Sequence, residues 1–264
     1  MLIVIHCIFL ALVAVSESRA SDENLVQWGE EIERTAGRIV FTPVRRESGR
    51  GEWRLPASQE RQDIILQYLR DSSFEAELAA AHALTVNWER GAERYHFIVL
   101  NMDLAGQWEN AREGLLGHEL GHVWLHAKGL VSPPFEPGPD ACISIQSADI
   151  VQHILIRAEM ERRGISSKEY LLNNLKISLD ALEKPGGARL TRCQRAIALS
   201  HWLDFRHGLE GGDWEEADRY EARHRDRYPD ISRLGDEIEK YLREHEITGR
   251  ESFLQAVAFV RERL

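Results

Sequence analysis

The alternation of apolar and polar residues along this chain predicts an α+β front half and a mainly helical rear half. Apolar residues recur at helical spacing over positions 23–34 and 58–70, and apolar runs at 38–44 and 96–101 predict strands. Past a cluster of proline and glycine at 133–140, helical spacing returns over 144–163, 167–183, 190–206, 214–225, 231–246 and 250–263. We therefore expect a small sheet in the front half, packed against helices.

The strand at 96–101 is followed by a short loop and then by a helix expected over 108–126. This helix combines apolar residues with acidic residues near its start, and it contains no proline. The order of strand, loop and helix predicts that the strand runs along a cleft beside the helix.

The predicted helix contains the run HELGH, from His118 to His122. Because residues four positions apart share one face of a helix, both imidazoles can bind one Zn²⁺ while Glu119 reaches a water at the ion. Zinc lowers the pKa of such a water from about 15.7 towards roughly 7, and a neighbouring carboxylate accepts its proton during attack on a carbonyl. The motif predicts a hydrolase, most simply a metallopeptidase.

Two observations bear on how specific this motif is. With 11 histidines in the chain, an accidental H-E-x-x-H has a probability of roughly a few per cent, and two helical histidines can also form hydrogen bonds within a core. Gly117 and Gly121 favour a metal site. Each destabilises the helix by about 1 kcal/mol relative to alanine, which indicates that a residue without a side chain is needed at these positions beside the ion. Bare backbone at these positions predicts the close approach of a strand or a substrate.

A catalytic zinc site needs a third protein ligand. The metzincin spacing would place it at position 128, which is a lysine, so that class is excluded. His126 follows His122 by one turn, but on a straight helix its side chain points past an ion held by the first two histidines. We expect His126 to orient another group or to face solvent.

Better candidates for the third ligand lie on the next long helix. His153 is surrounded by apolar neighbours, so it is carried into the interior, where an imidazole needs a metal or a hydrogen-bond partner. Asp149 lies one turn earlier on the same face and can accept a hydrogen bond from the free imidazole nitrogen. We predict His153 as the ligand, with Glu159 as the rival and Asp149 as a weaker alternative.

Composition limits the other functions that this chain can have. The 264 residues have a mass of 30.3 kDa and are 43% hydrophobic, which is enough to bury a sizeable core. The formal net charge of −10 argues against a nucleic-acid partner, because such binding depends on clustered Lys and Arg. We expect a peptide or protein substrate instead.

The start of the chain predicts export. The segment from Leu2 to Val15 is almost wholly apolar, and Ser18 and Ala20 give small residues at positions −3 and −1 of a signal-peptidase site. The apolar stretch is shorter than the roughly 18 to 20 residues that cross a bilayer. We therefore expect residues 1–20 to be a signal peptide, the protein to be periplasmic or secreted, and membrane contact to occur only through this segment, cleaved or retained as an anchor.

Cysteine usage is compatible with an oxidising compartment. Removal of residues 1–20 leaves Cys142 and Cys193, which allow a single pairing. A disulfide between them would close a loop of about 50 residues and contribute roughly 4 kcal/mol. Two buried free thiols, packed as small apolar side chains, are the alternative that the sequence leaves open.

The stretch IVLNMDLAGQWENAREGLLGHELGHVWLH, positions 98–126, resembles the zincin core of the IrrE/ImmA-like metallopeptidases. The resemblance implies an α+β zincin domain with His118 and His122 as zinc ligands and Glu119 as catalytic base. It also implies a glutamate as third ligand, within an E-x-E-A-N helix. Here Glu159 and Glu161 are followed by Arg-Arg-Gly, which departs from that pattern, so the third ligand stays open between His153 and Glu159.

The sequence thus predicts an exported zinc-dependent peptidase with a zincin-like core at 21–164, in which a small sheet packs on the HExxH helix, and a helical region at 165–264. One alternative is a zinc-binding protein without turnover, whose helices recognise a partner. Glu119 argues against it, because a structural zinc site closes all four coordination positions with protein ligands. A second alternative is an intracellular regulatory protease of the IrrE/ImmA type, which requires that the N-terminal segment is not exported.

Overall fold

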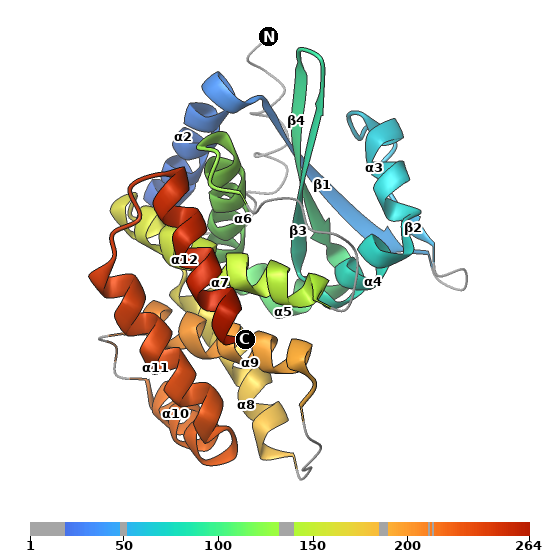
Figure 1. The fold of residues 1–264 in the computed structure, drawn as a ribbon. Coiled ribbons are helices and arrows are strands. Elements are labelled where there is room, and N and C mark those ends of the chain that lie inside the picture. The colour runs from blue at the N-terminus through green and yellow to red at the C-terminus, as the bar shows by residue number, and fades with distance from the viewer. Residues whose placement is uncertain (1–18, 48–51, 132–139, 185–189, 211, 213) are drawn as a thin grey trace.

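The fold is known from a computed structural model, which describes residues 19–47, 52–131, 140–184, 190–210, 212 and 214–264. It confirms an α+β front half and a helical rear half (Figure 1). Residues 1–18 of the predicted signal peptide and most of the predicted loop at 133–140 lie outside these residues. Among the described helices, none has both the length and the apolar character that a membrane span requires.

The front half contains a mixed sheet of four strands in the order β2-β1-β4-β3. β1 runs parallel to β4, whereas β3 is antiparallel to β4 and β2 is antiparallel to β1. The strands are β1 (Arg38–Arg46), β2 (Trp53–Arg54), β3 (Ala83–Arg90) and β4 (Glu93–Asn101). The strand predicted at 96–101 is therefore interior, between β1 and β3, and the prediction that it borders the cleft is wrong.

Helices cover both faces of the sheet. Because side chains alternate along a strand, Ile98 and Leu100 of β4 face one layer while Phe97 and Val99 face the other. The first layer holds α2 (Arg19–Ala36) and α6 (Arg112–Ala127), and the second holds α3 (Gln62–Leu69) and α4 (Ser72–Ala80), on the right in Figure 1. Burial on both faces explains why β4 reads as a continuous apolar run.

A tight connection joins β4 to α6. The Asn101 side chain donates to the carbonyl oxygen of Leu78 (2.7 Å) and accepts from the backbone N–H of Asp103 (3.1 Å), which turns the chain at the end of the strand. Short helical turns follow as η1 (Met102–Leu104), α5 (Ala105–Trp108) and η2 (Glu109–Ala111). The single helix predicted over 108–126 thus begins as separate turns before α6.

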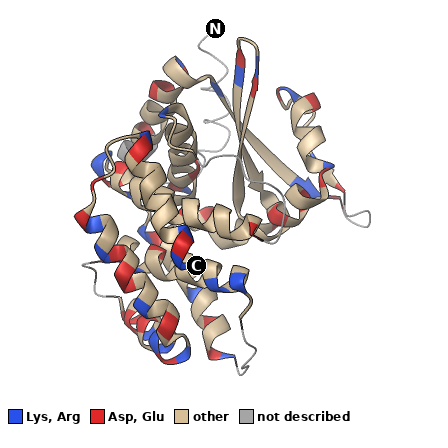
Figure 2. Ribbon diagram, viewed as in Figure 1, with Lys and Arg blue, Asp and Glu red and all other residues tan. Residues whose placement is uncertain are grey.

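The rear half consists of helices whose bounds lie within a few residues of those predicted. They are α7 (Ala141–Arg162), α8 (Lys168–Glu183), α9 (Arg192–Gly208), α10 (Glu215–Arg227), α11 (Pro229–Glu244) and α12 (Arg250–Arg263). One hydrophobic cluster runs from Leu25 in α2 to Val260 in α12, so the segments 21–164 and 165–264 share a core. Along α10 and α11, Lys and Arg positions are interspersed with Asp and Glu positions (Figure 2), and Arg225 forms an ion pair with Asp236.

The glycines of α6 allow α7 to approach closely. A Cβ added at Gly117 would lie 2.7 Å from Cε of Met160, and one at Gly121 would overlap the side chain of Ile156. Both contacts are made by α7, so the expectation that these glycines admit a strand or a substrate is wrong. Their function is to hold α7, and the residues it carries, against the HELGH helix.

A disulfide bond joins Cys142 near the start of α7 to Cys193 near the start of α9, with 5.7 Å between the two Cα atoms. It settles the choice between a disulfide and free thiols. Because it spans 51 residues of sequence, it ties together two helices that are distant along the chain but adjacent in the fold.

Candidate metal centre

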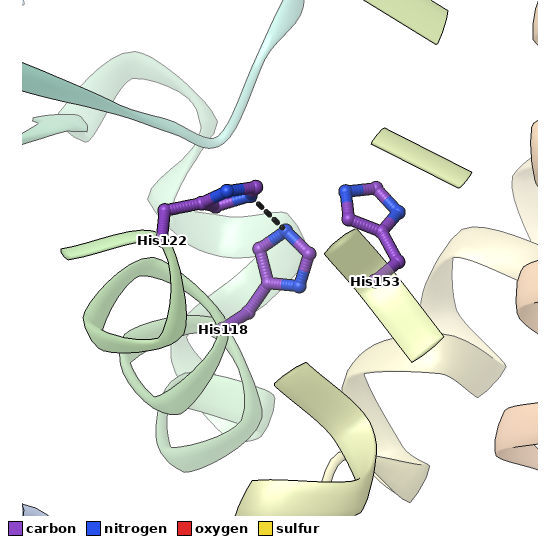
Figure 3. Close-up of side chains that lie close together, drawn as sticks. All are labelled: His118, His122 and His153. Carbon is purple, nitrogen blue, oxygen red and sulfur yellow. Dashed lines mark hydrogen bonds between the residues drawn. The ribbon is translucent and has the colours of Figure 1, made fainter. Parts of the chain in front are cut away.

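Three histidines converge beside the sheet. His118 and His122 come from α6 and His153 comes from α7, and their rings are directed into one space (Figure 3). One potential ligand nitrogen from each lies within 4.8 Å of the others. The Nε2 atoms of His118 and His122 are 3.2 Å apart, and the ring centroids of His118 and His153 are 4.6 Å apart.

This spacing suits a tetrahedral zinc ion. Two nitrogens, each about 2.1 Å from zinc at a tetrahedral angle, lie about 3.4 Å apart, so small movements of the three side chains would bring all of them to ligating distance. Burial holds the pKa of His118 well below its usual value and lowers that of His122 to about 3. Both imidazoles are therefore neutral at pH 7, which is the form that binds a metal.

The ring of His153 is oriented by a carboxylate from α9. Its Nδ1 lies 3.0 Å from Oδ2 of Asp204, which leaves Nε2 available for a ligand. Arg157 donates to the same carboxylate at 2.6 Å. Burial alone would raise the pKa of Asp204, but the charges of His153 and Arg157 hold it well below the usual value. The prediction that Asp149 accepts this hydrogen bond is wrong, because the carboxylate of Asp204, from the neighbouring helix α9, is the acceptor.

Burial opposes protonation of His153, but the Asp204 carboxylate outweighs it and raises the pKa of the imidazole. The partner of His122 is different. The Gln152 side chain hydrogen-bonds His122 and donates through Nε2 to the carbonyl oxygen of Leu130 (3.1 Å). The imidazole of His153 is thus oriented by Asp204, and the imidazole of His122 by Gln152.

Glu119 of α6 is buried against β3, the edge strand of the sheet. Thr85 of β3 donates its hydroxyl to Oε2 of Glu119 at 2.7 Å and holds that side chain in one orientation. Burial raises the pKa of Glu119 to about 7, despite the opposing effect of the Thr85 hydrogen bond. A carboxyl group with a pKa near neutrality can both accept and return a proton.

The histidines and Glu119 line a cavity of about 710 Å³. One wall is β3, the edge strand of the sheet, which contributes Ala83, Leu84, Thr85 and Asn87. The opposite wall comes from α7, α8 and α9. An edge strand beside the three histidines offers backbone donors and acceptors to an extended peptide.

The far wall carries further polar and apolar groups. Tyr170 of α8 has its ring 6.1 Å from that of His118, and burial raises the pKa of its hydroxyl. Burial lowers the pKa of His201 of α9, which lines the same cavity. Among the described residues, the exposed large apolar side chains are Ile177 and Ile197, at 51% and 37%, and both line this cavity. Exposed apolar groups at a cavity mouth are typical of a binding site.

Two residues considered in the sequence lie elsewhere. Glu159 pairs with Arg162 and Arg163 at 2.6 and 2.7 Å near the end of α7, and it lies outside the histidine group. Arg163 also pairs with Glu31 of α2. The ring of His126 packs edge-on against His96 with 5.4 Å between centroids. His126 is half-buried there and lies outside the histidine group, in agreement with the prediction that its side chain points past an ion held by His118 and His122.

Sequence reasoning missed four residues of the site: Thr85, Tyr170, His201 and Asp204. Thr85 lies in β3, which the apolar pattern did not predict, just as it did not predict β2 and α4, although alternation over ALTVNWER is a usable signal. The others lie on helices that were predicted, but the sequence does not say which residues of α8 and α9 face α6. Comparisons of the chain with protein-family models, with curated proteins and with solved structures found no match.

Proposed function

We propose that the protein is a zinc-dependent metallopeptidase with a zincin-like core, in which His118, His122 and His153 hold the ion and Glu119 is the general base. One observation carries the proposal. A third histidine, brought by a different helix, meets the two histidines of the HELGH motif with its free nitrogen available and its other nitrogen on Asp204. Three nitrogen ligands leave the fourth position of a tetrahedral site for water, as in catalytic sites.

When bound, zinc would supply a Lewis acid that makes a site water acidic and polarises the carbonyl under attack. The chain's own residues supply proton transfer and positioning. Glu119 accepts the proton of the attacking water and returns it to the leaving nitrogen, and Thr85 keeps its carboxylate in place. Asp204 fixes the imidazole of His153, and Tyr170 lies close enough to His118 to contact a bound substrate.

The free edge of β3 is the surface that we assign to the substrate backbone. An extended peptide pairing with β3 would lie across the mouth of the cavity and above the histidines. Ile177 and Ile197, on the opposite wall, would contact apolar side chains of the same peptide. This arrangement favours peptides or unfolded segments over folded proteins, because the substrate must be extended to bind.

Export is part of the proposal. The disulfide between Cys142 and Cys193 supports an oxidising compartment, since such bonds are rare where thiols are kept reduced. Helix α2 begins at Arg19, so cleavage after Ala20 would remove only its first two residues. Mass spectrometry of protein from its native cells should find Ser21 as the N-terminal residue, and an intact Met1 on a protein without a disulfide would contradict export.

The function is tested by the variant Glu119→Gln together with the wild type. Both proteins are loaded with zinc and incubated with a broad peptide library, and zinc content is measured in parallel. Glutamine keeps the shape and the hydrogen bond from Thr85 but cannot accept a proton, so hydrolysis should fall by at least about 10²-fold at unchanged zinc content. Equal hydrolysis by both proteins, or none by the wild type, would contradict the proposal.

A further inference from the structure

Asp149 is a carboxylate of the cavity that the proposed mechanism does not use. It lies on α7 one turn before His153 and lines the cavity. No residue in the described part of the chain forms a hydrogen bond or an ion pair with it, and Nδ1 of His153 is bonded to Asp204 instead. Asp149 is also outside the group of three nitrogens that lie within 4.8 Å of one another.

The charges around Asp149 make it a site for a cation. Glu77 of α4, which also lines the cavity, adds a second negative charge that acts on Asp149. The one arginine among the lining residues, Arg157, is paired with Asp204 at 2.6 Å. The His153 imidazole acts on Asp149 and opposes the rise of its pKa, but its hydrogen bond is made to Asp204. A bound cation would further lower the free energy of a carboxylate that is partly withdrawn from water.

We propose that Asp149, assisted by Glu77, binds a cationic group of the substrate, so that the site selects peptides with an ammonium or guanidinium group close to the bond that is cut. The inference rests on the proposed peptidase function. Burial raises the pKa of Asp149 to about 6, so the carboxylate is charged at pH 7 and attracts a cation. Two sources supply this chemistry, a Lys or Arg side chain and the N-terminal ammonium of a short peptide.

The test measures binding to a form that does not turn over. Zinc-loaded Glu119→Gln is mixed with fluorescent alanine-based peptides, and affinities come from fluorescence anisotropy. Three peptides are compared: one acetylated with a central norleucine, one acetylated with a central lysine, and one with norleucine and a free N-terminus. A uniform alanine host lets each peptide shift its register until the cation meets the carboxylate.

We expect the lysine peptide or the free-amine peptide to bind about tenfold more tightly than the acetylated norleucine peptide, and which of the two does so identifies the source of the cation. When Asp149→Asn is combined with Glu119→Gln, this preference should be abolished at unchanged zinc content. The exposed Asp226 of α10 supplies the matched control, since Asp226→Asn removes the same charge outside the cavity and should preserve the preference. Glu77→Gln should reduce the preference for the cationic peptide by about two- to threefold. Because Glu77 is exposed, this substitution carries no risk to folding.

Equal affinities for the three peptides, or a preference that survives both Asp149→Asn and Glu77→Gln, would overturn the inference. Loss of zinc from Asp149→Asn would overturn it too, because the residue would then be a metal ligand. Cleavage of the same peptides by wild-type protein is followed in parallel. A preference that depends on Asp149, without any cleavage by the wild type, would contradict the peptidase function while supporting the cation site.

Discussion

His153 and Asp204 are joined by a hydrogen bond of 3.0 Å although 51 residues separate them. The disulfide between Cys142 and Cys193 spans the same separation of 51 residues. His153 therefore follows Cys142 by as many residues as Asp204 follows Cys193, which means that α7 and α9 pack in parallel with one register. The covalent bond fixes that register about three helical turns from the group of three histidines.

The Asp204 carboxylate should control zinc affinity without contacting the ion. In Asp204→Asn, the amide cannot stabilise the Nδ1–H of His153 as a carboxylate does, and Arg157 loses its counter-charge. We expect zinc affinity to fall by about 10- to 100-fold, measured by competition with a chelating dye. Asp226→Asn is the control for the change in net charge. Wild-type affinity in Asp204→Asn would mean that His153 is oriented by another group or is not a ligand.

Removal of the disulfide should affect both stability and the metal centre. Because the bond closes a loop of 51 residues, we expect Cys142→Ser/Cys193→Ser to lower the free energy of unfolding by about 4 kcal/mol in chemical denaturation. Zinc affinity at a temperature where the variant is folded should also fall, since α7 and α9 are then less firmly held in register. A loss of stability with no change in zinc affinity would show that the metal centre does not depend on this bond.

Close packing of α6 on α7 gives a third prediction. A methyl group in Gly121→Ala would overlap Ile156 and move α7 away from α6. We expect destabilisation of about 1 to 3 kcal/mol and weaker zinc binding, although no ligand is changed. Gly106→Ala is a suitable control, because a Cβ there meets no atom within 4 Å. If Gly121→Ala binds zinc as tightly as the wild type, the glycine does not set the position of His153.

Acid should destabilise the rear half through His224. This imidazole is 1% exposed, and its Nδ1 lies 2.8 Å from Oγ of Ser232. Burial lowers its pKa to about 4 from the usual 6.5. The unfolded chain therefore takes up the proton more readily, and the stability that His224 contributes above pH 6.5 is lost as the pH falls towards 4.

Urea unfolding at pH 7.5 and pH 4.5 measures this contribution. We expect the wild type to lose about 2 to 3 kcal/mol more than His224→Gln over that interval, because glutamine does not titrate. His245→Gln, at an exposed position, is the control and should follow the wild type. Parallel losses in the wild type and His224→Gln would show that this histidine is not the acid-sensitive group.

The sequence predicted the parts of the site that depend on local spacing. His118, Glu119 and His122 lie on one helix, so helical geometry alone places them together. It could not identify Asp204, because the partner of His153 is set by the register between α7 and α9, which depends on packing and on the disulfide. Thr85 was missed for a similar reason, since the place of β3 at the edge of the sheet is decided by strand pairing.

The zinc content and affinity of three proteins, wild type, His153→Ala and Glu159→Ala, test the central claim most directly. Glu159 is held by Arg162 and Arg163, whereas His153 lies with His118 and His122. We predict about one zinc per chain in the wild type and in Glu159→Ala, and a strong loss in His153→Ala, because two histidines cannot hold the ion at the usual affinity. If His153→Ala binds zinc as tightly as the wild type while Glu159→Ala does not, the three-histidine site is wrong and a glutamate is the third ligand.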